Sequence, residues 1–168
     1  LTSDEALQIG PRLFRELIDA RRVVFVDDLR LYVAVERLPE IAAVVPADGS
    51  VAALFDPACT PLPWNDGLVV PASRRRVWPR DEALVEILRG RVAFAGPILA
   101  EDLARALGVD AAAVNTALET LEAQGVVLRG RFRPGAATTE WCERSLLSRI
   151  HRYTLNRLRA EIEPVSPA

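Results

Sequence analysis

The sequence predicts a mainly α-helical α+β fold in which small β-hairpins accompany short helices. Apolar residues recur at three- and four-residue spacings over 9–18 and again over much of 81–162, as in amphipathic helices. Two apolar runs, at 23–26 and 31–34, flank an acidic turn and therefore predict a hairpin. We expect a chain of helix-and-hairpin modules.

The composition is that of a globular protein, with 168 residues of which 50% are hydrophobic and 26% charged. No apolar run approaches the ~20 residues of a membrane span, and no signal peptide is recognised, so we expect a cytoplasmic protein without membrane contact. Cys59 and Cys142 lie far apart and predict neither a disulfide framework nor a zinc site. The start at Leu1 and the lack of methionine suggest a fragment of a longer protein.

The first two regions of the chain are residues 1–45 and 46–79. The first combines a helix, the hairpin and a short helix over 36–45, as in the second half of a helix-and-wing unit. The second holds six of the twelve prolines, a density that excludes helix and breaks central strands. Because it is also apolar, we expect a packed connector, with edge strands at 51–55 and 68–70.

The third region, 80–135, has the spacing of a helix-turn-helix. Helices are predicted at 81–88, 100–107 and 111–124, with Gly108 free to adopt the left-handed turn conformation between the last two. Asp110 is expected to cap the third helix. The predicted shared core consists of Leu103, Leu107, Val109, Val114, Leu118 and Leu121.

A strand from Val126 and a turn at Pro134 and Gly135 would add a wing to these three helices, and Gly125 would end the third helix. Regions 1–45 and 80–135 together therefore predict tandem winged helix-turn-helix modules. Residues 136–168 are expected to form a long amphipathic helix from Cys142 to about Ile162.

A sequence-specific DNA reader presents Arg, Asn or Gln on its second helix, where they reach base edges. The third predicted helix, which would take that place, exposes no arginine and carries two carboxylates. Direct base reading is therefore disfavoured. The exposed residues are Ala111, Ala112, Asn115, Thr116, Glu119 and Glu122.

Arg129, Arg131 and Arg133 alternate along the expected wing strand, which would place all three on one face. Such a row could bind successive phosphates without reading sequence. The alternative is a solvated edge strand that its charges protect from pairing.

The last predicted helix has an apolar stripe that includes Leu146, Leu147, Ile150, Tyr153 and Leu158, surrounded by Arg144, Arg149, Arg152, Arg157 and Arg159. A core-packing amphipathic helix explains the stripe. It leaves open whether the arginines contact DNA or a protein neighbour.

Nothing in the sequence predicts catalysis. The single histidine, His151, has no Cys, Asp or Glu cluster at ligand spacing, so we expect no metal site. Phosphate-loop, dinucleotide-binding and nucleophile-elbow motifs are absent from the sequence.

Several stretches of the sequence carry a family resemblance: Trp141-Cys142-Glu143-Arg144, residues 85–91, 128–132, 149–159 and 161–165, and Val35-Glu36-Arg37-Leu38 after the hairpin. Together they resemble the C-terminal extension of the bacterial large helicase-related proteins, Lhr. The resemblance spans nearly the whole chain, is dense over 83–164 and is loose in the middle connector. One departure is Leu99, which stands where a threonine usually caps the second helix.

The resemblance implies a non-motor part of an ATP-dependent DNA helicase linked to DNA repair. ATP and Mg²⁺ would then bind to the absent motor domains, and the partners would be single-stranded DNA and the remaining helicase domains. Glycosylase activity of the AlkZ type is not expected, since its Gln-containing motif is absent and the glutamines are Gln8 and Gln124. The expected phosphate contacts are Arg129, Arg131, Arg133, Arg149, Arg152, Arg74, Arg75 and Arg76.

Other functions stay open. The chain could be a scaffold module whose arginines pair with acidic surfaces of adjacent domains or of further copies in a homo-oligomer. A free-standing winged-helix regulator is less favoured because it needs a basic recognition helix.

Overall fold

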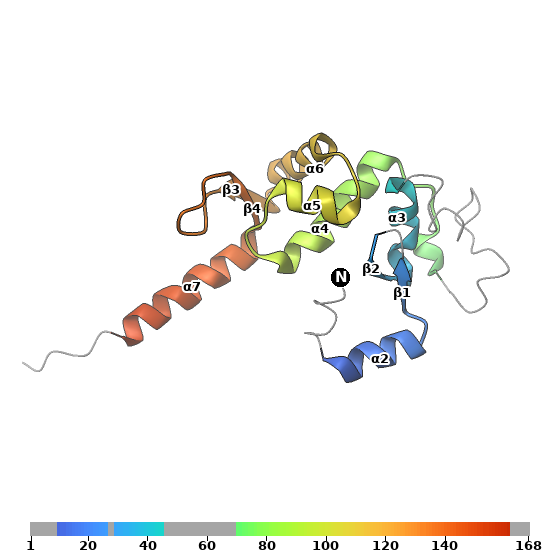
Figure 1. The fold of residues 1–168 in the computed structure, drawn as a ribbon, viewed down its shortest axis with the longest axis horizontal. Coiled ribbons are helices and arrows are strands. Elements are labelled where there is room, and N and C mark those ends of the chain that lie inside the picture. Colours follow the sequence, from blue (N-terminus) through green and yellow to red (C-terminus); the bar gives the residue numbers. More distant parts are fainter. Residues whose placement is uncertain (1–9, 27–28, 46–69, 162–168) are drawn as a thin grey trace, which may run out of the picture.

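The computed structural model describes residues 10–26, 29–45 and 70–161 (Figure 1). These residues form six α-helices and two separate two-stranded antiparallel sheets, which confirms the predicted α+β class. None of the described helices is long and apolar enough to cross a membrane. The predicted acidic turn, the connector over 46–69 and both ends of the chain lie outside the described residues.

The expected helix and hairpin form the N-terminal part. Helix α2 (Pro11–Asp19) begins with a proline, which is favoured in a first turn because its missing N–H has no partner there. Strands β1 (Val23–Val26) and β2 (Leu31–Ala34) pair antiparallel along their whole length, so the hairpin prediction is confirmed. The Phe14 and Tyr32 rings meet edge to face, with centroids 4.7 Å apart, and join the helix to the hairpin.

The short helix predicted over 36–45 forms as a 3₁₀ turn, η1 (Val35–Arg37), followed by α3 (Leu38–Val44). Val45 is extended, as expected for a residue that precedes a proline. Most of α3 is buried, and it packs along the next long helix.

Helix α4 spans Arg80–Ala95 and is longer than the helix predicted over 81–88. It continues because Val92 lies one turn beyond Leu88 and is also fully buried. Packing at this position outweighs the low helix propensity of Gly90. The helix ends at Gly96, whose φ of 66° closes it in a conformation that favours glycine.

Helices α5 (Ala100–Leu107) and α6 (Ala111–Ala123) form as predicted. Gly108 has a φ of 63° in the turn between them. The Asp110 carboxylate accepts hydrogen bonds from the amides of residues 112 and 113, at 3.1 and 3.3 Å, and so caps α6. Gly125 follows α6 with a φ of 70°, also as expected. Of the predicted core, Leu103, Leu107, Val114, Leu118 and Leu121 are buried and Val109 is partly buried against them.

The C-terminal hairpin joins β3 (Val127–Gly130) to β4 (Glu140–Glu143), and Ile98 adds an antiparallel bridge to Trp141. The prediction that the last helix begins at Cys142 was therefore wrong. Trp141 and Cys142 belong to a strand because β3 and Ile98 supply backbone partners from distant segments, while the core buries both side chains.

Helix α7 (Arg144–Ala160) follows β4 directly and extends away from the α4–α6 body (Figure 1). No residue of α7 is buried, so the core-packing helix expected from its apolar stripe does not form within the described residues. One continuous hydrophobic core instead joins the β1–β2 hairpin, α3, α4, α5, α6 and the C-terminal hairpin.

Candidate nucleic-acid interface

The three arginines of the C-terminal hairpin do not share one strand face. Strand β3 ends at Gly130, so Arg129 lies in the strand whereas Arg131 and Arg133 follow it. Arg129 is also engaged within the protein, since its Nη2 lies 3.4 Å from the Glu122 carboxylate. Its guanidinium carbon lies 5.5 Å from the centre of the Trp141 ring. The ion pair between Arg129 and Glu122 joins β3 to α6.

A buried carboxylate, Glu140, explains where β3 ends. It accepts hydrogen bonds from the backbone amides of Phe132, at 2.8 Å, and Arg133, at 3.0 Å, and forms an ion pair with the Arg133 side chain. Burial alone would raise the pKa of Glu140, but the hydrogen bonds from Arg133 and from the Phe132 amide, together with the Arg133 charge, lower it below its ordinary value. The amides of Phe132 and Arg133 therefore donate to this carboxylate and do not extend the pairing of β3 with β4. The Arg133 side chain holds the loop in place.

Arg131 differs from the other two hairpin arginines, Arg129 and Arg133. Its side chain is exposed, and no described residue forms an ion pair with it. Of the three hairpin arginines, Arg131 is thus the one whose charge is available to a ligand.

The arginine run at 74–76 is occupied within the protein. Arg74 Nη1 lies 3.5 Å from the buried Glu40 carboxylate, and Arg75 Nε donates to the Val70 carbonyl at 2.8 Å. The Arg76 guanidinium stacks 3.5 Å from the centre of the Trp78 ring and also lies 3.5 Å from Glu82. These contacts hold residues 70–79 against the rest of the fold. Because the three arginines already have partners, they offer less positive charge to a phosphate than their number suggests.

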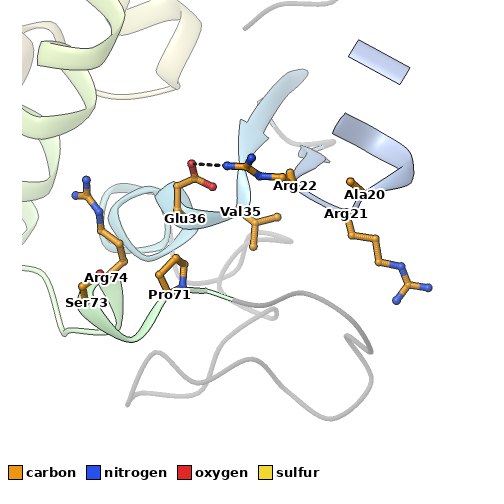
Figure 2. Close-up of a pocket in the computed structure, with 8 residues that line it drawn as sticks. All are labelled: Ala20, Arg21, Arg22, Val35, Glu36, Pro71, Ser73 and Arg74. Atoms are coloured by element: carbon orange, nitrogen blue, oxygen red, sulfur yellow. Dashed lines mark ion pairs between the residues drawn. The ribbon is translucent and has the colours of Figure 1, made fainter. Parts of the chain in front are cut away.

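A cavity of about 410 Å³ lies between the hairpin, η1 and the 70–74 segment (Figure 2). Arg22 and Arg74 line it, but Arg22 Nη2 lies 3.8 Å from Glu36, and Arg74 pairs with Glu40. In Figure 2 the Arg21 side chain points away from the other lining residues. The cavity therefore presents no concentrated positive charge to an anion.

Helix α7 is the most positively charged of the described helices, with five arginines and no Asp or Glu between Arg144 and Ala160. With about 100° of rotation per residue, Arg144, Arg159, Arg152 and Arg149 fall within an arc of about 140°. No described residue forms an ion pair with Arg152 or Arg159. Arg157 lies outside the arc and pairs with Glu161 at 3.1 Å.

The start of α7 fixes the direction of these arginines. Glu143 caps the helix, accepting from the amides of Ser145, at 3.0 Å, and Leu146, at 2.6 Å. Partial burial would raise the pKa of Glu143, but these hydrogen bonds and the nearby Arg149 charge lower it overall. The Arg144 amide donates to the Val126 carbonyl at 2.9 Å, which anchors the first turn beside the hairpin.

The exposed face of α6 offers no cation. Its polar side chains are bonded within the helix: Asn115 donates to the Ala111 carbonyl at 3.1 Å and Thr116 to the Ala112 carbonyl at 3.1 Å. Glu122 pairs with Arg129. This face has no arginine to place against a base edge or a phosphate.

The described residues contain no cluster of three His, Cys, Asp or Glu side chains that could hold a metal ion. His151 is exposed on α7. Cys142 is buried, and burial together with the charges of Glu143 and Glu140 raises its pKa, which disfavours a reactive thiolate.

The sequence predicted the arginines of this region but not the carboxylates that form ion pairs with them, which are Glu40, Glu122 and Glu140. A usable signal existed only for Glu140, which directly precedes the apolar pair Trp141 and Cys142 and follows the turn at Pro134 and Gly135. An acidic residue in a strand that returns to the core must find a partner.

No family model and no solved structure matches the chain. A curated protein from Mycolicibacterium smegmatis (strain ATCC 700084 / mc(2)155), described as an Lhr helicase and probable uracil glycosylase, is 31% identical over 71 residues. The match covers 42% of this chain, and it spans only 5% of the length of that protein. The similarity supports a weak link to Lhr-type helicases through a small part of their sequence.

Proposed function

We propose that this chain is a non-motor module of an Lhr-type DNA helicase and that it holds single-stranded DNA by sequence-independent phosphate contacts. The observation that carries the proposal is the set of arginines without ion-pair partners among the described residues, on α7 and the adjacent hairpin loop. Arg131, Arg149 and Arg152 are the proposed contacts. ATP and Mg²⁺ would be bound by motor domains elsewhere in the parent protein.

The order of elements supports a winged helix-turn-helix at the centre of this module. Three helices, α4, α5 and α6, precede a β-hairpin, and Ile98 bridges to the second hairpin strand. The α2 helix with the β1–β2 hairpin would be a partial second copy of the same unit. In a DNA-reading winged helix, α6 would enter the major groove, but its uncharged and acidic face disfavours base reading here.

The proposal is tested by a paired set of triple variants. Arg131→Gln, Arg149→Gln and Arg152→Gln together should lower the affinity for a labelled single-stranded oligonucleotide, measured by fluorescence anisotropy, by about tenfold to a hundredfold. This range follows from about 0.5–1 kcal/mol for each exposed, solvent-screened contact, at 1.4 kcal/mol for each factor of ten.

The matched control removes three exposed arginines that already have carboxylate partners. These are Arg12, paired with Glu16, Arg22, paired with Glu36, and Arg105, paired with Asp102. The three Gln changes alter the net charge equally but should leave the affinity within about threefold, roughly 0.6 kcal/mol. Equal losses in both triple variants would reduce DNA binding to a net-charge effect and contradict the proposed interface.

A second candidate function, a protein scaffold within the same helicase, is favoured by one observation, the exposed apolar stripe of α7. If DNA affinity is negligible for the unaltered chain and its association with other helicase domains depends on α7, this function replaces the first. A base-excision assay on uracil-containing DNA should show no product, because no catalytic site is proposed in this chain.

A further inference from the structure

Helix α7 has an apolar face that no described residue covers. Tyr153 is 71% exposed, Leu158 is 53% exposed and Ile150 is 39% exposed, although residues of these types are usually buried. A shallow depression of about 690 Å³ borders this face, and it is lined by Leu146, Ile150 and Tyr153 together with Arg149, Arg152 and Asn156. Most helical stability in proteins comes from the packing of an amphipathic face, and the described residues leave this face of α7 without such packing.

Three of the apolar residues and Thr154 form a narrow seam, which leaves Leu146, Tyr153 and Leu155 outside it. Leu147, Ile150, Thr154 and Leu158 are spaced by three, four and four residues, and they fall within an arc of about 80° at about 100° per residue. This spacing is typical of a helix that packs against one other helix. A membrane surface requires a wider apolar face, and Arg157 separates Leu146 and Tyr153 from the seam.

Positive charge borders the seam on both sides. Arg157 lies along one margin and Arg144 along the other, and no Asp or Glu occurs within α7. A second copy of α7 laid on the seam would set arginines against arginines in either orientation. An acidic helix would set carboxylates against both margins.

We propose that the seam of α7 is the docking surface for an acidic amphipathic helix of a partner protein. Leu and Ile side chains of that helix would cover Leu147, Ile150 and Leu158, and its flanking Glu and Asp side chains would pair with Arg144 and Arg157. The arginines on the opposite arc, including Arg152 and Arg159, stay accessible. The docking surface thus does not depend on the proposed DNA contacts.

The probe is a synthetic acidic peptide of about three heptads, with Leu at the a and d positions and Glu at the e and g positions. It should bind the chain saturably in isothermal titration calorimetry. The same peptide with Lys in place of Glu should bind at least about tenfold more weakly, because like charges would then face each other across the seam.

Two matched variants locate the site. Ile150→Asn lies in the seam and Leu155→Asn lies about 140° away on the same helix, although the two original side chains are almost equally exposed, at 39% and 37%. Ile150→Asn should weaken peptide binding at least about tenfold, since burying an isoleucine contributes that much. Leu155→Asn should change it by less than about threefold. Circular dichroism checks that α7 stays helical in both.

The same samples separate the alternative occupants. Binding to phosphatidylglycerol vesicles that Ile150→Asn abolishes, without peptide binding, would assign the face to a lipid surface and overturn the proposal. So would a dimer in sedimentation equilibrium that Ile150→Asn converts to monomer. Equal effects of Ile150→Asn and Leu155→Asn on the peptide, or equal affinity for the acidic and basic peptides, would also refute it.

Discussion

The buried carboxylate of Glu40 makes a strong prediction about the arginine run at 74–76. The Glu40 side chain is fully buried, and its Oε1 lies 3.2 Å from Arg37 Nη1 and 3.5 Å from Arg74 Nη1. Its other oxygen has no hydrogen-bond partner among the described residues. Replacing both arginines with glutamine would leave this buried charge uncompensated.

The expected loss in the free energy of unfolding is about 3 kcal/mol, within the range for breaking a buried ion pair. It falls at the lower end because the Arg37 and Arg74 side chains are 32% and 42% exposed, so water screens the pairs in part. Adding Glu40→Gln to the double variant removes the buried charge. The triple variant should therefore recover to within about 1 kcal/mol of the unaltered protein.

Urea unfolding followed by circular dichroism measures these differences, and anisotropy measures DNA affinity of the folded double variant. The affinity should be unchanged, because the structure places Arg74 in a structural role. A double variant as stable as the original protein, or a triple variant no more stable than the double, would refute the assignment of this charge cluster.

Three further predictions follow from single residues. Because the pKa of Glu140 is lowered in the folded protein, its carboxylate stabilises the hairpin loop at pH values above the ordinary carboxylate range. This contribution is lost as the pH falls through the lowered pKa. The NMR amide signals of Phe132 and Arg133 should shift in that pH range, and Glu140→Gln should abolish the shift. Leu99 precedes α5 in an extended conformation without a side-chain cap, so Leu99→Thr should raise the free energy of unfolding by about 1 kcal/mol, and no gain in urea unfolding would contradict the capping argument. Gly108→Ala should lower the free energy of unfolding by about 1–2 kcal/mol through the left-handed φ alone, because the added Cβ would lie at an ordinary 3.7 Å from Leu29. An unchanged urea midpoint would count against backbone strain at this position.

Local signals account for the parts of the fold that the sequence predicted. Asp110 caps α6 through amides two and three residues away, and Gly108 makes the preceding turn, so both can be recognised from neighbouring residues. Helix α4 was predicted too short because the packing of Val92 outweighs the local effect of Gly90. Tandem winged units and the boundaries of the four regions remain predictions.

The candidate site was less predictable because its partners are distant in sequence. The spacing of Arg129, Arg131 and Arg133 implies one face only while the strand continues, and Glu140 ends that strand from the opposite side of the hairpin. Arg74 meets a carboxylate 34 positions earlier in the chain, Glu40. Helical periodicity likewise predicted the apolar face of α7 but could not show that the core leaves it uncovered.

The most direct test of the proposed function is the salt dependence of single-stranded DNA binding. The logarithm of the binding constant should fall linearly with the logarithm of salt concentration, with a slope of about −0.7 for each phosphate contact. Replacing Arg131, Arg149 and Arg152 with glutamine should therefore make the slope shallower by about 2. The Arg12, Arg22 and Arg105 control should keep the original slope, and an unchanged slope in the first variant would contradict the proposed phosphate contacts.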